Sequence, residues 1–254
     1  MIKIKEPKPH LLLFALGLIG ILSALPLIPQ LLELQPEKPP IPIEAIQAAS
    51  VIQGSVLLLL MVWLGANFSR RVGLAAPVIQ ALANKAYIRE EIRPQILPAF
   101  IGGIAGGAFL LLFFKVVSIH LPPEFIIAGD KLAPPWYTKL LYGGITEEIL
   151  IRWGLMSFLV WVIYRITQRK DSEVKAHNYI LGIIISALVF GIGHLPIAFA
   201  LAPEVTAYLI AYIIIGNAAF GLIAGYLYWK RGLECAIGAH MIAHITMIIG
   251  NGIS

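Results

Sequence analysis

The chain has 254 residues, of which 59% are hydrophobic and only 13% are charged, and its formal net charge is +5. A soluble domain of this length has too little interior to bury so much apolar surface, so the composition excludes a soluble globular protein and indicates a bilayer protein. The basic residues lie in short segments between apolar runs, which is typical of membrane topology and not of a nucleic-acid-binding face.

Seven apolar stretches of about twenty residues or more follow one another, each long enough to cross a hydrocarbon layer of about 30 Å as a helix. Because backbone groups in lipid must be satisfied internally, we expect helices even where Val and Ile are abundant. The sequence therefore predicts an all-α, polytopic transmembrane helix bundle of about seven spans. The expected spans are Leu11–Leu32, Ala45–Phe68, Leu97–His120, Thr138–Thr167, Tyr179–Leu201, Thr206–Trp229 and Leu233–Gly250.

The charges of the loops predict the orientation. If all seven stretches cross, the opposite side has few basic residues, namely Lys38 and Lys131, with Lys139 near the membrane edge. By the positive-inside rule the N-terminus is then cytoplasmic and the C-terminus lies outside. The basic residues assigned to the cytoplasmic side are Lys3, Lys5, Lys8, Arg70, Arg71, Lys85, Arg89, Arg93, Arg165, Arg169, Lys170, Lys175, Lys230 and Arg231.

Two loops and the glycine pattern add further expectations. Val78–Arg89 mixes apolar and polar residues, which favours an interfacial amphipathic helix, with a plain connector equally compatible. Leu121–Pro135 is rich in proline and is expected to be irregular. Glycines spaced four apart predict close helix packing within the monomer in preference to dimerisation. They are Gly102, Gly103, Gly106, Gly107, Gly221 and Gly225.

The fourth span contains adjacent carboxylates inside apolar sequence, where each ionisable group costs roughly 2.5–3.5 kcal/mol on insertion scales. Glu148 and Arg152 lie four residues apart, so they share a helix face and can pair. Glu147 is rotated by about 100° from that face and lacks this local partner, so it can act as general base or acid. The alternative is a charge network that only locks helices together.

Histidines in the fifth and seventh spans complete the polar cluster. His194 follows two glycines, and Pro196 removes a backbone donor, so the helix is expected to loosen just beyond His194. His240 and His244 are spaced i, i+4, a pattern that points two rings at one cavity or at a metal. As a metal signature it is weak, but Glu147 would complete a zinc site of two histidines and one carboxylate.

In chain order, Glu147-Glu148-xxx-Arg152, Phe190-xxx-His194 and a helix bearing His240 resemble the three motifs of the CPBP family. These are the CAAX-protease and bacteriocin-processing intramembrane proteins, which include the Ras-converting CAAX endopeptidases. The resemblance covers roughly Lys139 to Asn251. Each motif is short, but three in order on transmembrane helices are fairly specific.

The resemblance implies a glutamate-type intramembrane endopeptidase that needs no metal, with its core in the four C-terminal spans. By this likeness Glu147 activates a water with help from His194, and His240 and the residue four positions later stabilise the oxyanion. Glu148, Arg152 and Phe190 would support the site. The family commonly has Asn where this chain has His244. A neutral His can donate one hydrogen bond as Asn does, but it can also ligate a metal, which keeps zinc as the alternative cofactor.

We expect one integrated membrane domain, with N-terminal helices in residues 1–137 and a CPBP-like catalytic core in residues 138–254. The expected partners are the bilayer and a peptide or protein substrate, with lipidation of the substrate left open, and no nucleic acid. The competing functions are a zinc-dependent intramembrane peptidase and a non-catalytic scaffold or regulator of the same fold. A transporter is disfavoured because the polar residues match no inverted repeat.

The predicted orientation raises two questions of position. It places Glu147 and His194 nearer the outer leaflet, whereas His240 lies early in an outward-running helix, nearer the cytoplasm unless that helix tilts or starts late. CAAX processing would need cytosolic access, so we follow the loop charges and infer no CAAX substrate. Asn217, a further polar residue inside a span, is expected to hydrogen-bond between helices in preference to a site role.

Overall fold

The computed structural model describes residues 9–35, 39–132, 134–168 and 173–253, and this part of the chain is helical with no strand. Seven helical runs in it are long and apolar enough to cross a membrane, and each overlaps one of the seven expected stretches. The predicted all-α, multi-pass membrane fold is therefore confirmed. The runs are Pro9–Glu33, Ile43–Val72, Arg89–His120, Trp136–Thr167, Ala176–Leu201, Ala207–Arg231 and Leu233–Gly252.

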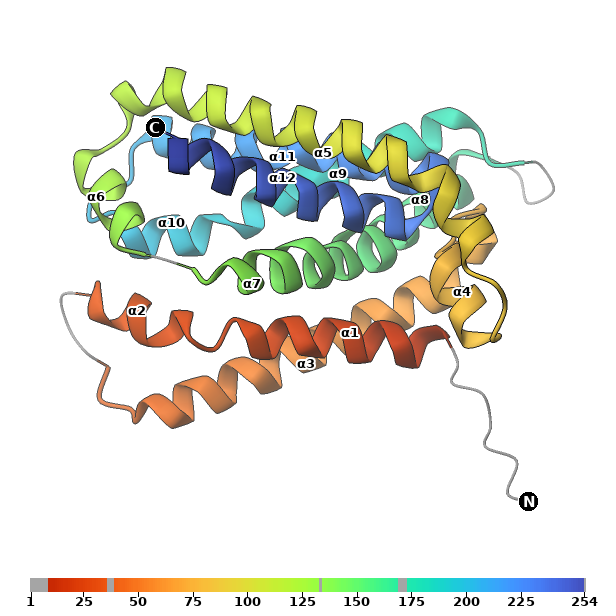
Figure 1. Cartoon of the computed structure of the whole chain (residues 1–254), viewed down its shortest axis with the longest axis horizontal. Coiled ribbons are helices and arrows are strands. Elements are labelled where there is room, and N and C mark those ends of the chain that lie inside the picture. Colours follow the sequence, from red (N-terminus) through yellow and green to blue (C-terminus); the bar gives the residue numbers. More distant parts are fainter. Residues whose placement is uncertain (1–8, 36–38, 133, 169–172, 254) are drawn as a thin grey trace.

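Figure 1 shows the helices lying roughly side by side, with the chain passing back and forth between the two ends of the bundle. In chain order the elements are α1 (Pro9–Ser23), α2 (Leu27–Glu33), α3 (Ile43–Phe68), η1 (Ser69–Val72), α4 (Pro77–Ala83), α5 (Arg89–Val117), η2 (Ser118–His120), α6 (Pro123–Lys131), α7 (Trp136–Thr138), η3 (Lys139–Thr146), η4 (Ile149–Met156), α8 (Ser157–Thr167), α9 (Ala176–Gly193), α10 (Leu195–Leu201), α11 (Ala207–Arg231) and α12 (Leu233–Ile253).

The fourth span, which runs from α7 through η3 and η4 to α8, lies at the centre of the packing. α1 packs against η3 and α3 against η4, while α12 and α9 contact the same span from other sides. α5 packs against both α11 and α12 (Figure 1). The carboxylates of the fourth span are therefore surrounded by protein and not by lipid.

Glycines on α5 let this helix approach two neighbours at once. A Cβ added at Gly103 would lie 2.5 Å from Cβ of Ile242 on α12, and one at Gly106 would lie 2.7 Å from the ring of Phe220 on α11. Both distances are too short for real side chains, so only glycine permits this packing. The predicted role of the glycine spacing within the monomer is confirmed.

The prediction of an interfacial amphipathic helix over Val78–Arg89 is wrong. Only α4 is helical there, and its Val78 and Ile79 are buried inside the protein. The helix ends at Ala83, and Arg89 already opens α5. The apolar residues of α4 contact protein instead of lipid, because α4 packs against α1 and α12.

The irregular loop expected over Leu121–Pro135 is also corrected by the structure, because it contains α6. Pro123 occupies the first turn of this helix, where a missing backbone N–H costs nothing. Its side chains Phe125 and Ile126 pack with Tyr212 and other apolar residues of α11. The prolines here start a helix instead of preventing one.

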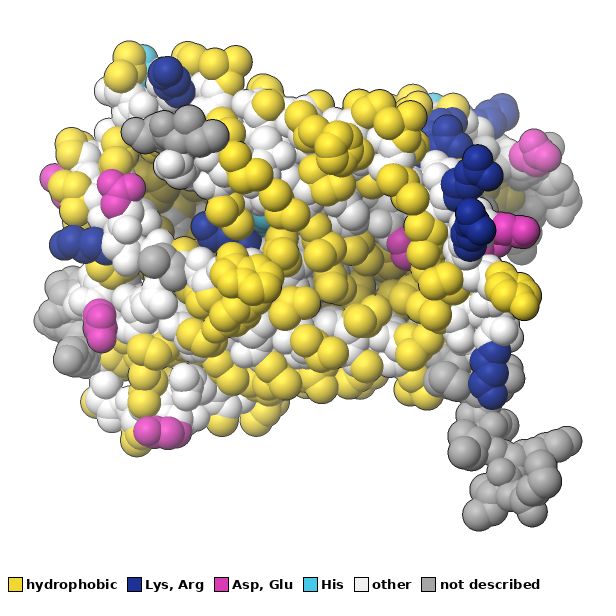
Figure 2. Space-filling view, in the orientation of Figure 1, with side chains coloured by type: hydrophobic (Ala, Val, Ile, Leu, Met, Phe, Trp, Pro, Cys, Tyr) yellow, Lys and Arg dark blue, Asp and Glu magenta, His cyan; other side chains and the backbone are white. Residues whose placement is uncertain are grey.

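The two ends of the bundle differ in charge. Figure 2 shows Lys and Arg side chains gathered at the end that carries α4, while hydrophobic side chains cover the middle of the visible face. This basic end includes Arg70 and Arg71 of η1 and Lys230 and Arg231 of α11. Some residues used to predict the orientation lie outside the described residues, namely Lys3, Lys5, Lys8, Lys38, Arg169 and Lys170.

Candidate active site

Two π-helical segments, η3 and η4, flank the adjacent residues Glu147 and Glu148. The Glu147 side chain is 17% exposed, whereas the Glu148 side chain is completely buried. Local widening of a helix to i→i+5 hydrogen bonding is rare and often marks functional sites, because it re-aims side chains. Neighbouring carboxylates are thus directed into two different surroundings.

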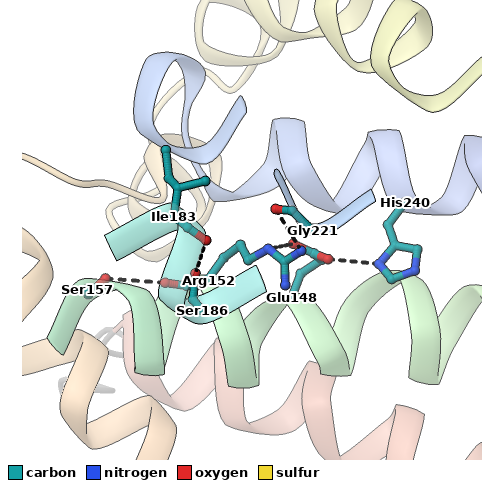
Figure 3. Close-up of polar contacts among 7 residues, drawn as sticks. All are labelled: Glu148, Arg152, Ser157, Ile183, Ser186, Gly221 and His240. Carbon is teal, nitrogen blue, oxygen red and sulfur yellow. Dashed lines mark hydrogen bonds and ion pairs between the residues drawn. The ribbon is translucent and has the colours of Figure 1, made fainter. Parts of the chain in front are cut away.

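Glu148 belongs to a closed network that joins the four C-terminal spans. Its Oε2 lies 3.2 Å from Nε of Arg152, and its Oε1 lies 2.8 Å from Nδ1 of His240 on α12. The Arg152 guanidinium also donates to the carbonyl oxygen of Gly221 on α11 at 3.3 Å and lies 4.9 Å from the ring centroid of Phe190 on α9. Figure 3 shows Arg152, Glu148 and His240 converging between these helices.

This network determines which nitrogen of His240 carries hydrogen. Glu148, held beside the Arg152 guanidinium, is an acceptor, so His240 donates through Nδ1. In the neutral ring Nε2 then has no hydrogen, and it gains one only when the ring becomes an imidazolium.

His194 lies where the fifth span breaks. α9 ends at Gly193 and α10 begins at Leu195, so the predicted loosening of the helix at this position is confirmed. Nδ1 of His194 lies 2.8 Å from the carbonyl oxygen of Phe190, which can only accept, so this nitrogen carries the hydrogen. Nε2 of His194 therefore carries a lone pair, and this atom lies 3.8 Å from Oε1 of Glu147.

Phe190 contacts both histidines and the arginine of the buried ion pair. Its ring meets His194 edge to face, with centroids 4.7 Å apart, and lies 6.1 Å from the ring of His240. Since Phe190 is also 4.9 Å from the Arg152 guanidinium, one side chain touches all three polar groups. Replacement by a smaller residue would therefore loosen both histidines together.

His244 stacks on His240, with ring centroids 4.9 Å apart and planes inclined by 13°. Its Nε2 is buried and has no hydrogen-bond partner among the described residues. A Cβ added at Gly143 would collide with this nitrogen, so the glycine provides the space that the ring occupies. The sequence contained Gly143 beside the carboxylates but no local signal that it would face His244.

A cavity of about 740 Å³ connects these groups and extends towards α2 and α6. Glu147, His194, His240 and His244 all line it. Other polar or aromatic lining residues, which the sequence pattern did not single out, come from the same helices and from α11. They include Thr138, Lys139, Tyr142, Tyr212 and Phe220.

Asn217 also lines the cavity, and its side chain donates to the carbonyl of Ile213 one turn earlier on α11 at 2.8 Å. The prediction that Asn217 forms a hydrogen bond to another helix is therefore wrong for its amide nitrogen. In a helix the carbonyl four residues back is within reach of a short polar side chain, and that local partner is used here.

The question of depth raised by His240 is answered by the lengths of the helices. The fourth span has 32 residues and the seventh has 20. His240, 7 residues after Leu233, contacts Glu148, 19 residues before Thr167, so the seventh span starts deeper than the level at which the fourth span ends. α12 begins directly after the turn at Gly232, whose φ of 110° suits glycine, and its first residue donates to the carbonyl of Ala75 in the loop before α4. His240 thereby reaches the level of Glu148.

Among the described residues, no group of three or more His, Cys, Asp and Glu side chains is close enough together to hold a metal ion. Glu147 and His194 approach one another, and Glu148 and His240 form the second pair. The carboxylate nearest to His240 is thus the one already paired with Arg152 and not Glu147.

The fold and this site define a multi-pass membrane protein with carboxylates, histidines and an arginine gathered around one cavity inside the bundle. Residues 130–246 match the family model described as type II CAAX prenyl endopeptidase Rce1-like. This match supports assignment of this part of the chain to the CPBP/CAAX endopeptidase family and, with it, an intramembrane protease. A search of curated proteins and a search of solved structures each found no match.

Proposed function

We propose that this protein is a metal-free intramembrane endopeptidase in which Glu147 and His194 activate a water. The observation that carries the proposal is the 3.8 Å separation of Glu147 Oε1 and His194 Nε2 at the wall of a shared cavity. This distance is too long for a direct hydrogen bond and suits a bridging water. Family membership makes a peptide or protein the substrate class.

Nε2 of a neutral His194 and Oε1 of an ionised Glu147 are both hydrogen-bond acceptors that face the attacking water. A water that donates one hydrogen to each of them directs a lone pair away from both, towards a scissile carbonyl. As its oxygen forms the C–O bond, one proton passes to Glu147. That proton later goes to the leaving amine as the C–N bond breaks, leaving a carboxylic acid and an amine as products.

The negative oxygen of the tetrahedral intermediate needs donors already in place. We assign His240 this role through Nε2, which carries hydrogen in the imidazolium that Glu148 stabilises from the other side of the ring. Two stacked imidazolium rings would repel each other, so His244 is proposed to stay neutral beside a charged His240. His244 then contributes one hydrogen-bond donor and part of the cavity wall.

The different roles that we assign to Glu147 and Glu148 follow from their surroundings. Glu147 is partly exposed to the cavity and, within the described part of the chain, has no Lys or Arg at contact distance, which suits a group that gains and loses a proton. Glu148 is buried against Arg152 and His240, which suits a group that stays charged. Arg152 and Phe190 are assigned to positioning, because neither lies between Glu147 and His194.

The deciding experiment compares peptide profiles of membranes that contain the wild type or Glu147→Gln, with zinc content measured on the same preparations. We expect products that disappear in the variant, from protein without stoichiometric zinc. Products that persist would remove Glu147 from the mechanism, and one zinc per chain would favour the zinc-dependent peptidase. No product from either protein, with unchanged folding, would favour a scaffold or regulator.

A further inference from the structure

A second hollow lies on the outside of the bundle, between α5 and α11, and has a volume of about 560 Å³. Its walls include Leu97, Ile101 and Gly102 of α5 and Leu222, Tyr226 and Leu227 of α11. Leu97 is 65% exposed and Ile101 is 59% exposed, and both belong to a membrane-spanning helix. The groove is thus apolar and opens towards the hydrocarbon layer.

Helix periodicity places basic residues at one end of this groove. On α5, Arg93 lies four residues before Leu97, so it continues the same face. On α11, Lys230 and Arg231 lie four residues after Tyr226 and Leu227 and continue both lining faces. α5 begins, and α11 ends, at the basic end of the molecule, so these charges meet there (Figures 1 and 2).

All three basic side chains are exposed, and within residues 9–35, 39–132, 134–168 and 173–253 none of them forms an ion pair with a carboxylate. Arg89 adds a further positive charge one turn beyond Arg93. Glu90 and Glu91 in the first turn of α5 oppose this set of four basic residues, but neither lines the groove. The local charge at the groove mouth is therefore positive.

We propose that this groove binds an acyl chain of an anionic phospholipid, whose phosphate is held by Arg93, Lys230 and Arg231. The dimensions agree, because Ile101 lies eight residues after Arg93, about 12 Å farther along the helix, from the headgroup level into the hydrocarbon layer. Tyr226 and Trp229 lie at the same end, where aromatic side chains prefer the membrane–water boundary. This site does not depend on peptidase activity.

Gly102 gives the groove its depth. A Cβ at this position would lie 2.8 Å from Leu227 on the opposite wall, so any larger residue would fill the floor. The rest of α5 is held tightly against α11 and α12 by glycine contacts, which leaves this open stretch as a notch in a packed surface. An acyl chain in this groove would be contacted on two sides, by α5 and by α11.

The test measures lipid retained by purified protein in detergent after mixing with equal amounts of phosphatidylglycerol and phosphatidylcholine, by native mass spectrometry. We expect phosphatidylglycerol to be retained in at least about tenfold excess. Lys230→Gln/Arg231→Gln should lower this ratio towards one, by at least about fivefold, because a single charge near the membrane surface contributes about 1 kcal/mol. The matched control Arg70→Gln/Arg71→Gln removes two adjacent charges from the same end, away from the groove, and should leave the ratio unchanged.

A second variant tests the groove without altering charge. Ile101→Trp fills the open side of the hollow and should lower retention of phosphatidylglycerol at an unchanged detergent melting temperature. Soluble glycerol phosphate should fail to displace the lipid, because the acyl chain contributes to binding. The proposal would be overturned by a wild-type ratio near one or by equal losses in both double variants. It would also be overturned by full retention in Ile101→Trp or by displacement of the lipid by glycerol phosphate.

Discussion

Nε2 of His194 and Oε1 of Glu147 lie 3.8 Å apart although the residues are 47 positions apart and belong to different spans. The exposed fractions of these side chains are 29% and 17%, and both line the same cavity. Next to them, Glu148 and Arg152 are completely buried. The adjacent residues Glu147 and Glu148 therefore differ in their surroundings: Glu147 lines the cavity, whereas Glu148 is buried in the protein.

Glu147→Gln should lower peptide cleavage by at least about 100-fold, since an amide cannot take a proton from water at the active pH. The detergent melting temperature should change little, because none of the described Lys and Arg side chains lies at contact distance from Glu147. Cleavage by membranes and melting by circular dichroism are the measurements. Wild-type turnover in the variant would contradict the assignment.

Glu148→Gln should act mainly on stability. Removing this carboxylate leaves the Arg152 guanidinium buried without its compensating charge, a change that costs about 3–5 kcal/mol in soluble proteins. It also weakens the bond to His240, so cleavage should fall together with melting temperature. A variant that melts like the wild type would show that Arg152 is compensated elsewhere.

Gly143→Ala should displace His244, because the added Cβ would collide with the ring nitrogen of that residue. We expect cleavage to fall by about tenfold or more through the stacked His240 ring. Gly193→Ala is the matched control, since it adds the same methyl group beside His194 where no atom lies within 4 Å. Equal activity of the two variants would show that the position of His244 is unimportant.

His244→Asn should keep much of the activity, whereas His244→Ala should lose most of it. Asn restores a neutral hydrogen-bond donor, while Ala removes both the donor and the ring that packs on His240. Chelator treatment should leave the wild type and the Asn variant equally active. Loss of both activities on chelation would instead support a metal held by the histidines.

Single-cysteine labelling tests the predicted orientation. Glu124 on α6 and Glu173 before α9 are exposed and lie at opposite ends of the bundle, and the native Cys235 is buried. In intact cells an impermeant maleimide should label Glu124→Cys but not Glu173→Cys, as the positive-inside rule requires. The reverse pattern would put the cavity end at the cytosol, where CAAX substrates are processed.

Length and hydropathy were enough to predict the seven spans, because lipid requires about twenty apolar residues per helix whatever their packing. The i, i+4 pairing of Glu148 with Arg152 was predictable for a similar reason, since helix geometry is local. The two loops were predicted incorrectly. Whether α4 covers lipid or protein depends on surfaces formed by α1 and α12, which no local pattern contains.

The sequence by itself determined which side chains had to be placed inside the membrane and which helix each of them would occupy. Only the tertiary structure decided that Glu148, and not Glu147, would meet His240, and that Gly143 would make room for His244. The physical reason is that periodicity gives the angle of a side chain around its own helix. The axial offset and rotation between helices come from packing, here from a short seventh span and glycine contacts.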